Sequence, residues 1–363
     1  MNFIFSHLKK MDWFLVASAS LLTCFGLVCI YGISLNKNDF LLFEKQLIFF
    51  GAGILLVILL SFFDWRAIRE SPYFILILYF FCFLSLLGLL LFASRTRGAL
   101  GWYKLGFLSF DPIELAKIVL IILLAKYFSM RHVEMYRLRH IVLSGLYVFF
   151  LAILVFFQPN FGSAMILVCL WIGILAISGI KLRHFLVLCI CGFLILLSAW
   201  FFFLKDYQKE RIISFVAPQS DPLGTSWNQN QAKIAIGSGG VFGQGFAKGS
   251  QTQYGFLPEP HTDFIFAAIG EEFGLAGIMV LFSLIGILIW RVMKIAFESH
   301  SNFSRLFASG FAIVLATQIF IHIGMNLGIA PVIGISLPFV SYGGSGLLAL
   351  YTGLGILESI KTH

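Results

Sequence analysis

Charged residues are scarce in this sequence, and acidic residues are the scarcest. Only 12% of the 363 residues are charged and only 17 are Asp or Glu, whereas 60% are hydrophobic. The mean hydropathy is +0.95. A water-soluble domain of this length could not bury so much apolar surface in its own core. The composition therefore excludes an ordinary soluble protein and predicts an integral membrane protein.

Long apolar runs recur along the chain. Crossing the hydrocarbon core of a bilayer takes roughly 20 apolar residues in a helix. Ten runs approach this length, at about 12–34, 45–63, 72–93, 112–129, 141–157, 161–179, 184–204, 273–290, 306–330 and 338–359. We therefore predict an all-α polytopic membrane protein with about ten transmembrane helices, in which residues 1–363 form a single membrane domain. Residues 205–272 are expected to form a long loop with short helices between the seventh and eighth spans.

The hallmarks of many metal and nucleotide sites are missing. The six cysteines fall within apolar runs without the spacing of a zinc site, so we interpret them as packing residues. The glycine-rich stretch "GSGGVFGQG" (237–245) does not follow a strand within a βαβ unit, as a dinucleotide site requires. We interpret this stretch as a flexible, closely packed loop, and no organic cofactor is expected.

Basic residues predict how the chain is oriented. The net charge of +8 does not indicate a nucleic-acid partner, because the basic residues are spread over short loops. With ten spans, both termini lie on one side of the membrane. Fourteen of the 25 Lys and Arg residues lie on that side; five lie in the opposite short loops, five in the long loop and one in the fourth span. This excess predicts cytoplasmic termini and an extracytoplasmic long loop.

Four of the few carboxylates gather in "LPEPHTDFIFAAIGEE" (257–272), next to the eighth span; they are Glu259, Asp263, Glu271 and Glu272. Partial desolvation at a membrane edge would raise a carboxyl pKa and suit the group to proton transfer. Asp263 is therefore a candidate catalytic base. The alternative is an acid in the first turn of a helix capped by Thr262. A hard divalent cation held by Asp263 and Glu259 is favoured over a transition-metal site that includes His261.

Basic and aromatic residues elsewhere are candidates for binding an anionic substrate. Arg95, Arg97 and Trp102 lie in the outer loop "SRTRGALGWYKLG". This loop is either an interfacial aromatic belt or a docking site for a phosphate-bearing headgroup. Glu114 and Lys117 are three residues apart on one helix face, where they can form an ion pair.

A polar stripe marks one face of the ninth span. Gln318, His322 and Asn326 recur every four residues, which aligns them on a helix. Such a stripe indicates either hydrogen bonding between helices or the wall of a hydrated cavity.

Several segments together resemble the SEDS family (shape, elongation, division and sporulation) of peptidoglycan polymerases over nearly the whole chain. They include "GWYKLGFLSFDPIELAK", "QPNFGSA", "IAIGSGGVFGQGFAKGSQTQYGFLPEPHTDFIFAAIGEE" and "NLGIAPVIGISLPFVSYGGSG". The last two are highly specific. The segments "DPLG" and "KGSQTQ" resemble the sequences of the elongation branch of the family more than those of its division branch.

The resemblance implies a glycosyltransferase that polymerises lipid II at the outer face of the bacterial cytoplasmic membrane. Asp263, in "TDFIF", matches the proposed catalytic residue of the family, and Trp102 matches a functional aromatic residue. The family works beside a class B penicillin-binding protein, a transpeptidase of the elongation machinery. It is also thought to use a divalent cation, which implies Mg²⁺ or Mn²⁺ here.

Three positions depart from the family pattern. Gly101 stands where Arg is frequent, Ile113 where Ser is usual and Asn160 where Asp is usual. The change at Asn160 removes an expected partner for Lys117, which leaves Glu114 to take that place.

The implied chemistry is a single inverting displacement. Asp263 would take the proton of the acceptor's 4-hydroxyl while the donor, the nascent glycan, releases undecaprenyl diphosphate. The residues expected to bind substrate are Arg95, Arg97, Trp102, Glu114, Lys117, Lys248, Glu259, His261, Glu271, His322 and Asn326. Two alternatives stay open: a lipid II flippase and a non-catalytic scaffold of the elongation machinery.

Overall fold

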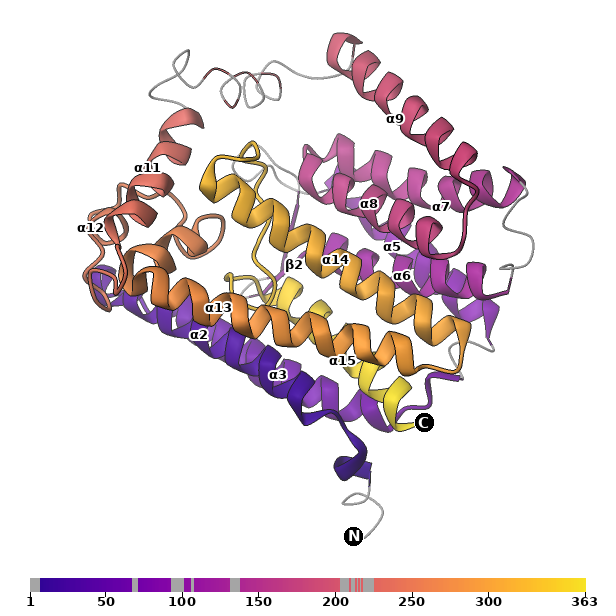
Figure 1. Ribbon diagram of the computed structural model, residues 1–363, viewed down its shortest axis with the longest axis horizontal. Coiled ribbons are helices and arrows are strands. Elements are labelled where there is room, and N and C mark those ends of the chain that lie inside the picture. The colour runs from indigo at the N-terminus through magenta and orange to yellow at the C-terminus, as the bar shows by residue number, and fades with distance from the viewer. Residues whose placement is uncertain are drawn as a thin grey trace.

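The computed structural model describes residues 7–66, 71–92, 101–105, 108–130, 138–202 and 225–363, together with residues 209, 213, 215 and 217. Arg95 and Arg97 lie outside these residues. Within the described part, each predicted span coincides with a helix (Figure 1). The ten helices are α2 (Trp13–Lys37), α3 (Leu41–Phe62), α5 (Pro72–Phe92), α6 (Pro112–Ser129), α7 (Leu138–Phe157), α8 (Phe161–Ile177), α9 (Leu182–Phe202), α13 (Ile265–Glu298), α14 (Asn302–Leu327) and α15 (Gly344–Thr362).

Helix length and hydropathy confirm the predicted membrane fold. In the described residues, six helices are long and apolar enough to cross a bilayer, namely α2, α3, α5, α7, α13 and α14, and α8 and α9 include shorter apolar helical stretches. Helices α6 and α15 carry charged residues, but Lys117 of α6 and Glu358 of α15 are buried inside the bundle. Burial against neighbouring helices lets these two segments keep their charges away from lipid.

The eighth helix begins earlier than the predicted span. Helix α13 begins at Ile265 instead of about residue 273, because "IFAAIGEE" forms a short helix that continues across a kink at Gly274. Gly274 has φ of 64°, a conformation that favours glycine. The predicted capping role of Thr262 is wrong: the N-cap residue is Phe264, whose side chain makes no cap hydrogen bond, and Asp263 precedes the first turn.

Among the described residues, a two-stranded hairpin and two short helices lie outside the ten helices. Strands β1 (Tyr103–Leu105) and β2 (Leu108–Phe110) form an antiparallel hairpin, with Tyr103 opposite Phe110. Its tyrosine hydroxyl donates to the Ser85 carbonyl of α5 at 2.7 Å. The predicted long loop contains the short helices α11 (Thr225–Ser238) and α12 (Ser250–Gln253). The sequence indicated the short helices but not the hairpin.

Helix packing defines two opposite ends of the molecule. Helix α13 packs between α2 and α14, and α15 packs against α3 (Figure 1). At one end, Gly32 of α2 accepts a hydrogen bond from Gln253 of α12, which also contacts Glu272 of α13. At the other end, Asp12 at the start of α2 contacts Arg291 of α13. We call the first the α12 end and the second the Asp12 end.

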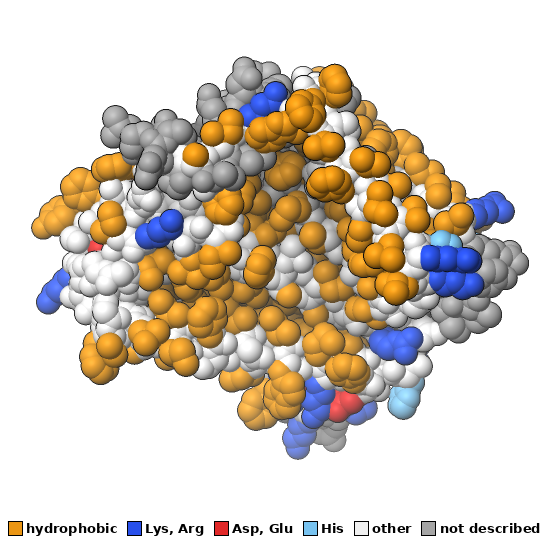
Figure 2. All heavy atoms as spheres, turned by 45° about the horizontal axis from the view of Figure 1, so that its top comes forward, with side chains coloured by type: hydrophobic (Ala, Val, Ile, Leu, Met, Phe, Trp, Pro, Cys, Tyr) orange, Lys and Arg blue, Asp and Glu red, His pale blue; other side chains and the backbone are white. Residues whose placement is uncertain are grey.

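The outer surface is apolar across the helices. Figure 2 shows hydrophobic side chains spread over most of the visible face, with Lys and Arg mainly near its margins. Many large hydrophobic residues on the helices are exposed, among them Phe14, Tyr73, Phe80 and Trp290. Contiguous apolar surface of this extent would aggregate in water, and lipid chains are the environment that covers it.

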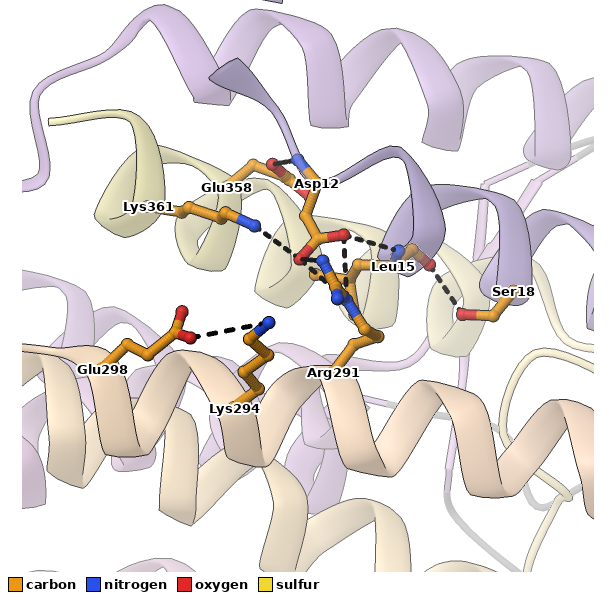
Figure 3. A network of polar contacts seen from close by, with 8 residues as sticks. All are labelled: Asp12, Leu15, Ser18, Arg291, Lys294, Glu298, Glu358 and Lys361. Atoms are coloured by element: carbon orange, nitrogen blue, oxygen red, sulfur yellow. Dashed lines mark hydrogen bonds and ion pairs between the residues drawn. The ribbon is translucent and has the colours of Figure 1, made fainter. Parts of the chain in front are cut away.

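A charge network closes the Asp12 end of the bundle (Figure 3). The Asp12 carboxylate accepts hydrogen bonds from Arg291 Nε at 3.0 Å and from Lys361 Nζ at 2.7 Å. Its backbone N–H donates to the buried Glu358 carboxylate at 2.8 Å. Burial alone would raise the pKa of Asp12, but the hydrogen bonds from Lys361 and Arg291 outweigh it and lower the pKa. Asp12 therefore joins α2, α13 and α15 as an ionised side chain.

Removing the charge of Asp12 should destabilise the bundle. Asp12→Asn leaves the largely buried Arg291 without its counter-ion, which is expected to lower the free energy of unfolding by about 3 kcal/mol. The matched control is Lys294→Gln. Lys294 pairs with Glu298 close to the Asp12 network (Figure 3), but the distance is 3.6 Å and both side chains are exposed. Its effect should stay within about 0.5 kcal/mol. Thermal unfolding in detergent measures both, and equal midpoints would contradict this account of the network.

Candidate active site

Asp263 lies in a tight turn just before α13. The N–H groups of Thr262 and Phe264 both donate to the Glu259 carbonyl, at 3.2 and 3.3 Å. Glu259 has φ of 42°, which non-glycine residues rarely adopt, so the turn depends on these bonds. Phe264 is buried with Ala267 and Ala268 in a small apolar cluster that also includes Ala232 of α11. The turn is therefore anchored on the side of α11.

A buried asparagine holds the same turn from α14. Asn326 is fully buried, and its Nδ2 donates to the Asp263 carbonyl at 3.0 Å and to the His322 carbonyl at 2.8 Å. Its Oδ1 accepts the Ala267 N–H at 3.2 Å. His322 is also fully buried, and its Nδ1 donates to the Ile335 carbonyl at 2.7 Å. Direct contact of either side chain with substrate would require it to become exposed.

The loop between α14 and α15 covers the third side of the turn. Ser341 Oγ donates to the Thr262 carbonyl at 2.8 Å, and the Tyr342 N–H donates to the His261 carbonyl at 2.8 Å. Burial raises the pKa of the Tyr342 hydroxyl, and the Tyr342 ring lies edge-on to the His261 ring, with centroids 5.9 Å apart. Sequence reasoning missed both residues. Their "SYGGSG" motif carried the resemblance, but no local pattern indicated a partner 79 residues away.

The Asp263 carboxylate faces a glycine. A Cβ added to Gly334 would lie 3.7 Å from Asp263 Oδ2, and Gly334 itself is exposed. Its φ of 68° favours glycine. Asp263 is partly buried, so its carboxylate lies at the edge of the protein interior beside a residue without a side chain. A reactant can approach this side of Asp263 more closely than it could approach a bulky neighbour.

The glycine-rich stretch 237–245 packs tightly against the backbone of α13. A Cβ on Gly239 would lie 1.9 Å from the Gly270 carbonyl oxygen, and one on Gly243 would lie 2.1 Å from the Glu272 carbonyl oxygen. Hydrogen bonds from Gln244 and Gly245 to this part of α13 complete the contact. The predicted close packing of this stretch is therefore confirmed, and its first two residues, 237 and 238, belong to the end of α11.

Glu271 holds α12 in place. Its fully buried carboxylate accepts hydrogen bonds from the N–H and Oγ1 of Thr252, at 3.0 and 2.6 Å, and from Gln251 N–H at 2.6 Å. Ser250 Oγ donates to it as well, at 3.3 Å. Lys248 lies just before this helix with an exposed side chain. The structure thus gives Glu271 four local donors, and a contact with substrate would require some of them to be displaced.

The predicted ion pair of α6 is confirmed. Lys117 Nζ lies 2.7 Å from the Glu114 carboxylate, and the lysine side chain is only 3% exposed. The pair lies beside α15, since a Cβ on Gly346 would be 3.6 Å from Glu114. Asn160, the departure from the family pattern, accepts the Ser163 N–H at 3.1 Å and caps α8. Glu114 is therefore the partner of Lys117.

The remaining candidates lie near the surface. Glu259 Oε2 and His261 Nε2 are 3.6 Å apart, and both side chains are partly exposed. Trp102 is exposed just before β1. Among the described residues, no three His, Cys, Asp or Glu side chains form a metal cluster. Mg²⁺ is often held by only one or two carboxylates together with substrate phosphates, so a divalent cation at Asp263 and Glu259 stays a prediction.

Comparisons in sequence place these features in a known family. The model of the FtsW, RodA and SpoVE family of cell cycle proteins matches residues 10–363. The chain is 37% identical over 333 residues to the peptidoglycan glycosyltransferase MrdB of Escherichia coli K12, covering 91% of this chain and 88% of MrdB. It is also 37% identical over 288 residues to the probable peptidoglycan glycosyltransferase FtsW of Haemophilus influenzae, covering 78% and 72% of the two chains.

Solved structures agree with the sequence matches. The fold is similar to a chain from a structure describing how a peptidoglycan synthase complex coordinates polymerization and crosslinking, with a TM-score of 0.83, 31% identity and 97% of both chains covered. It is also similar to the rod shape determining protein RodA of Thermus thermophilus, with a TM-score of 0.71, 30% identity and coverage of 97% and 96%. The chain therefore belongs to the FtsW, RodA and SpoVE family, the SEDS family that its motifs resemble.

Proposed function

We propose that this chain, a peptidoglycan glycosyltransferase of its family, polymerises lipid II with Asp263 as general base. The observation that carries this proposal is the construction of the Asp263 turn. Its backbone is anchored from α11, from α14 and from the loop before α15, while its carboxylate lies beside exposed Gly334. A fixed base at an accessible edge is what proton abstraction from a bound hydroxyl requires.

The proposed reaction is one displacement at the donor's anomeric carbon. Asp263 accepts the proton of the lipid II 4-hydroxyl as its oxygen forms the new glycosidic bond. The bond between the donor sugar and undecaprenyl diphosphate breaks, and the diphosphate leaves with the electron pair. Inversion turns an α-linked diphosphate sugar into a β-linked glycan. Because the acceptor oxygen is the nucleophile, no side chain has to form a covalent intermediate.

Cations stabilise the departing diphosphate. Lys117 is a buried ammonium that neighbours α15 through Glu114, and Lys248 is an exposed ammonium beside α12. We assign these two, together with Arg95 and Arg97, to the neutralisation of the leaving group, where positive charge acts on the developing negative charge. A Mg²⁺ or Mn²⁺ ion held by Asp263 and Glu259 would supply further positive charge. Trp102, His261 and Glu271 are proposed to shape the substrate site.

The proposed setting is the bacterial inner membrane during cell elongation. The basic residues on the side of the termini favour a cytoplasmic location for both termini. The α12 end and Asp263 then face the outside, where the glycan grows. The structural similarity to a peptidoglycan synthase complex supports a class B penicillin-binding protein as partner, and other membrane proteins of the elongation machinery are expected beside it.

Loss of the Asp263 carboxylate should nearly abolish polymerisation. Asp263→Asn and Asp263→Ala are expected to lower the rate by about 10²- to 10⁴-fold, since a general base supplies an effect of this size. The matched control is Asp39→Asn, because Asp39 is an exposed carboxylate that accepts the Leu41 N–H in the turn between α2 and α3. It should retain the wild-type rate. Gel analysis of glycan made from purified lipid II by the complex with its transpeptidase partner measures each rate.

The outcome also separates the alternatives. Wild-type rates from correctly folded Asp263 variants would contradict the assignment of the base. Absence of glycan from every sample, together with transfer of lipid II between leaflets of a proteoliposome, would favour a flippase. Normal cell elongation with either Asp263 variant would favour a scaffold.

The ion pair of α6 should affect the rate separately from stability. Lys117→Met leaves the partly buried Glu114 unpaired and Glu114→Gln leaves the buried Lys117 unpaired, so each alone should lower the unfolding temperature. The double variant removes both charges and should recover stability, while polymerisation stays about 10²-fold below wild type because one diphosphate cation is lost. The double variant Lys294→Met and Glu298→Gln, which removes an exposed pair, is the control. Wild-type polymerisation by the α6 double variant would show that Lys117 serves stability alone.

A further inference from the structure

Three consecutive carbonyl groups at the site are each held by a donor from a distant part of the chain. The His261 carbonyl accepts from the N–H of Tyr342, the Thr262 carbonyl from Ser341 Oγ, and the Asp263 carbonyl from Asn326 Nδ2. These distances lie between 2.8 and 3.0 Å. The main chain on which Asp263 stands is therefore fixed by α14 and by the loop that follows it.

Asn326 also completes the start of α13. The first N–H groups of a helix lack partners within it, and an N-cap side chain usually accepts the N–H two or three residues into the helix. Phe264, the N-cap residue, cannot do this. The Oδ1 of Asn326 accepts the Ala267 N–H, at the third helical position. A side chain of α14 thus provides the cap that the local sequence lacks.

Ser341 makes the corresponding link to the loop. Its hydroxyl donates to the Thr262 carbonyl and accepts the Leu337 N–H at 2.8 Å. Ser341 is 5% exposed and Asn326 is fully buried, so neither side chain is placed to touch a substrate. Each side chain accepts one backbone N–H and donates to one carbonyl of the Asp263 turn, so its loss would remove both bonds.

We propose that Asn326 and Ser341 are positioning residues for the reaction: together they set the place and direction of the Asp263 carboxylate. This inference rests on the proposed function, in which Asp263 is the base. Rotation of the turn about its anchors would move the carboxylate away from the acceptor hydroxyl. A displacement of about 1 Å at a reacting group can lower a rate by about 10²-fold. The effect should appear in kcat, because the substrate contacts are unchanged.

Two pairs of variants test this role. Asn326→Ala is compared with Gln318→Ala, which removes another buried amide two turns earlier on the same helix. Ser341→Ala is compared with Ser345→Ala, whose hydroxyl also makes two bonds, accepting from Asp111 N–H and donating to the Ser109 carbonyl. We expect kcat to fall about 10- to 100-fold for Asn326→Ala and Ser341→Ala. The controls should stay within about twofold, and KM for lipid II should change little in all four.

The decisive comparison uses the residual activity of Asp263→Ala. A residue that acts through Asp263 should have no further effect once that carboxylate is gone, so adding Ser341→Ala or Asn326→Ala should leave the residual rate unchanged. A merely structural role would lower it again by the same factor. Ser341→Ala removes a single hydroxyl, which keeps the test valid if Asn326→Ala fails to fold.

The experiments distinguish failure of the proposed function from failure of the positioning role. If Asp263→Ala polymerises at the wild-type rate, the proposed function fails. If Asp263→Ala shows the expected loss of rate while Asn326→Ala and Ser341→Ala behave like their controls, only the positioning role is overturned. Equal losses in the presence and absence of the Asp263 carboxylate would also overturn it.

Discussion

The hydrogen bonds of the Asn326 side chain are the contact on which the candidate site depends most. One buried amide joins three parts of the chain: the His322 turn of its own helix, the carbonyl of Asp263 and the third N–H of α13. Without it, the N-terminus of α13 has no side-chain cap and the turn before it loses an anchor. The turn that carries the candidate base is thus held by α14 as well as by its own hydrogen bonds to the Glu259 carbonyl and by the loop before α15.

Close backbone contacts make this arrangement possible. Gly239 and Gly243 bring the loop after α11 onto the carbonyls of α13, where a methyl group would collide with them. Glu271 then fastens α12 with four hydrogen bonds. At the opposite end, Asp12 joins α2 to α13 and α15 through Arg291 and Lys361. Helix α13 is therefore held at both ends, and the ionised carboxylate of Asp12 is kept apart from the α12 end.

Much of the fold could be predicted because a membrane imposes simple local rules. Apolar runs of about the bilayer thickness predicted all ten helices, and the three-residue spacing of Glu114 and Lys117 predicted their ion pair. The features that the sequence did not predict correctly depend on contacts between residues far apart in the chain. The predicted Thr262 cap ignored the competing acceptor on Asn326, which lies 59 residues beyond Ala267. The spacing of Gln318, His322 and Asn326 predicted a polar stripe on α14, but it could not predict that His322 and Asn326 bond the carbonyls of Ile335 and Asp263. The hairpin β1–β2 is too short to give an alternating pattern.

The central claim is that Asp263 takes the proton of the acceptor hydroxyl. Its most direct test is a structure of the Asp263→Asn variant, in complex with its transpeptidase partner, with lipid II and a glycan donor bound. The account predicts that the acceptor's 4-hydroxyl lies within about 2.6–3.2 Å of the side chain at position 263, next to Gly334. A hydroxyl bound against another carboxylate, with position 263 out of reach, would contradict it.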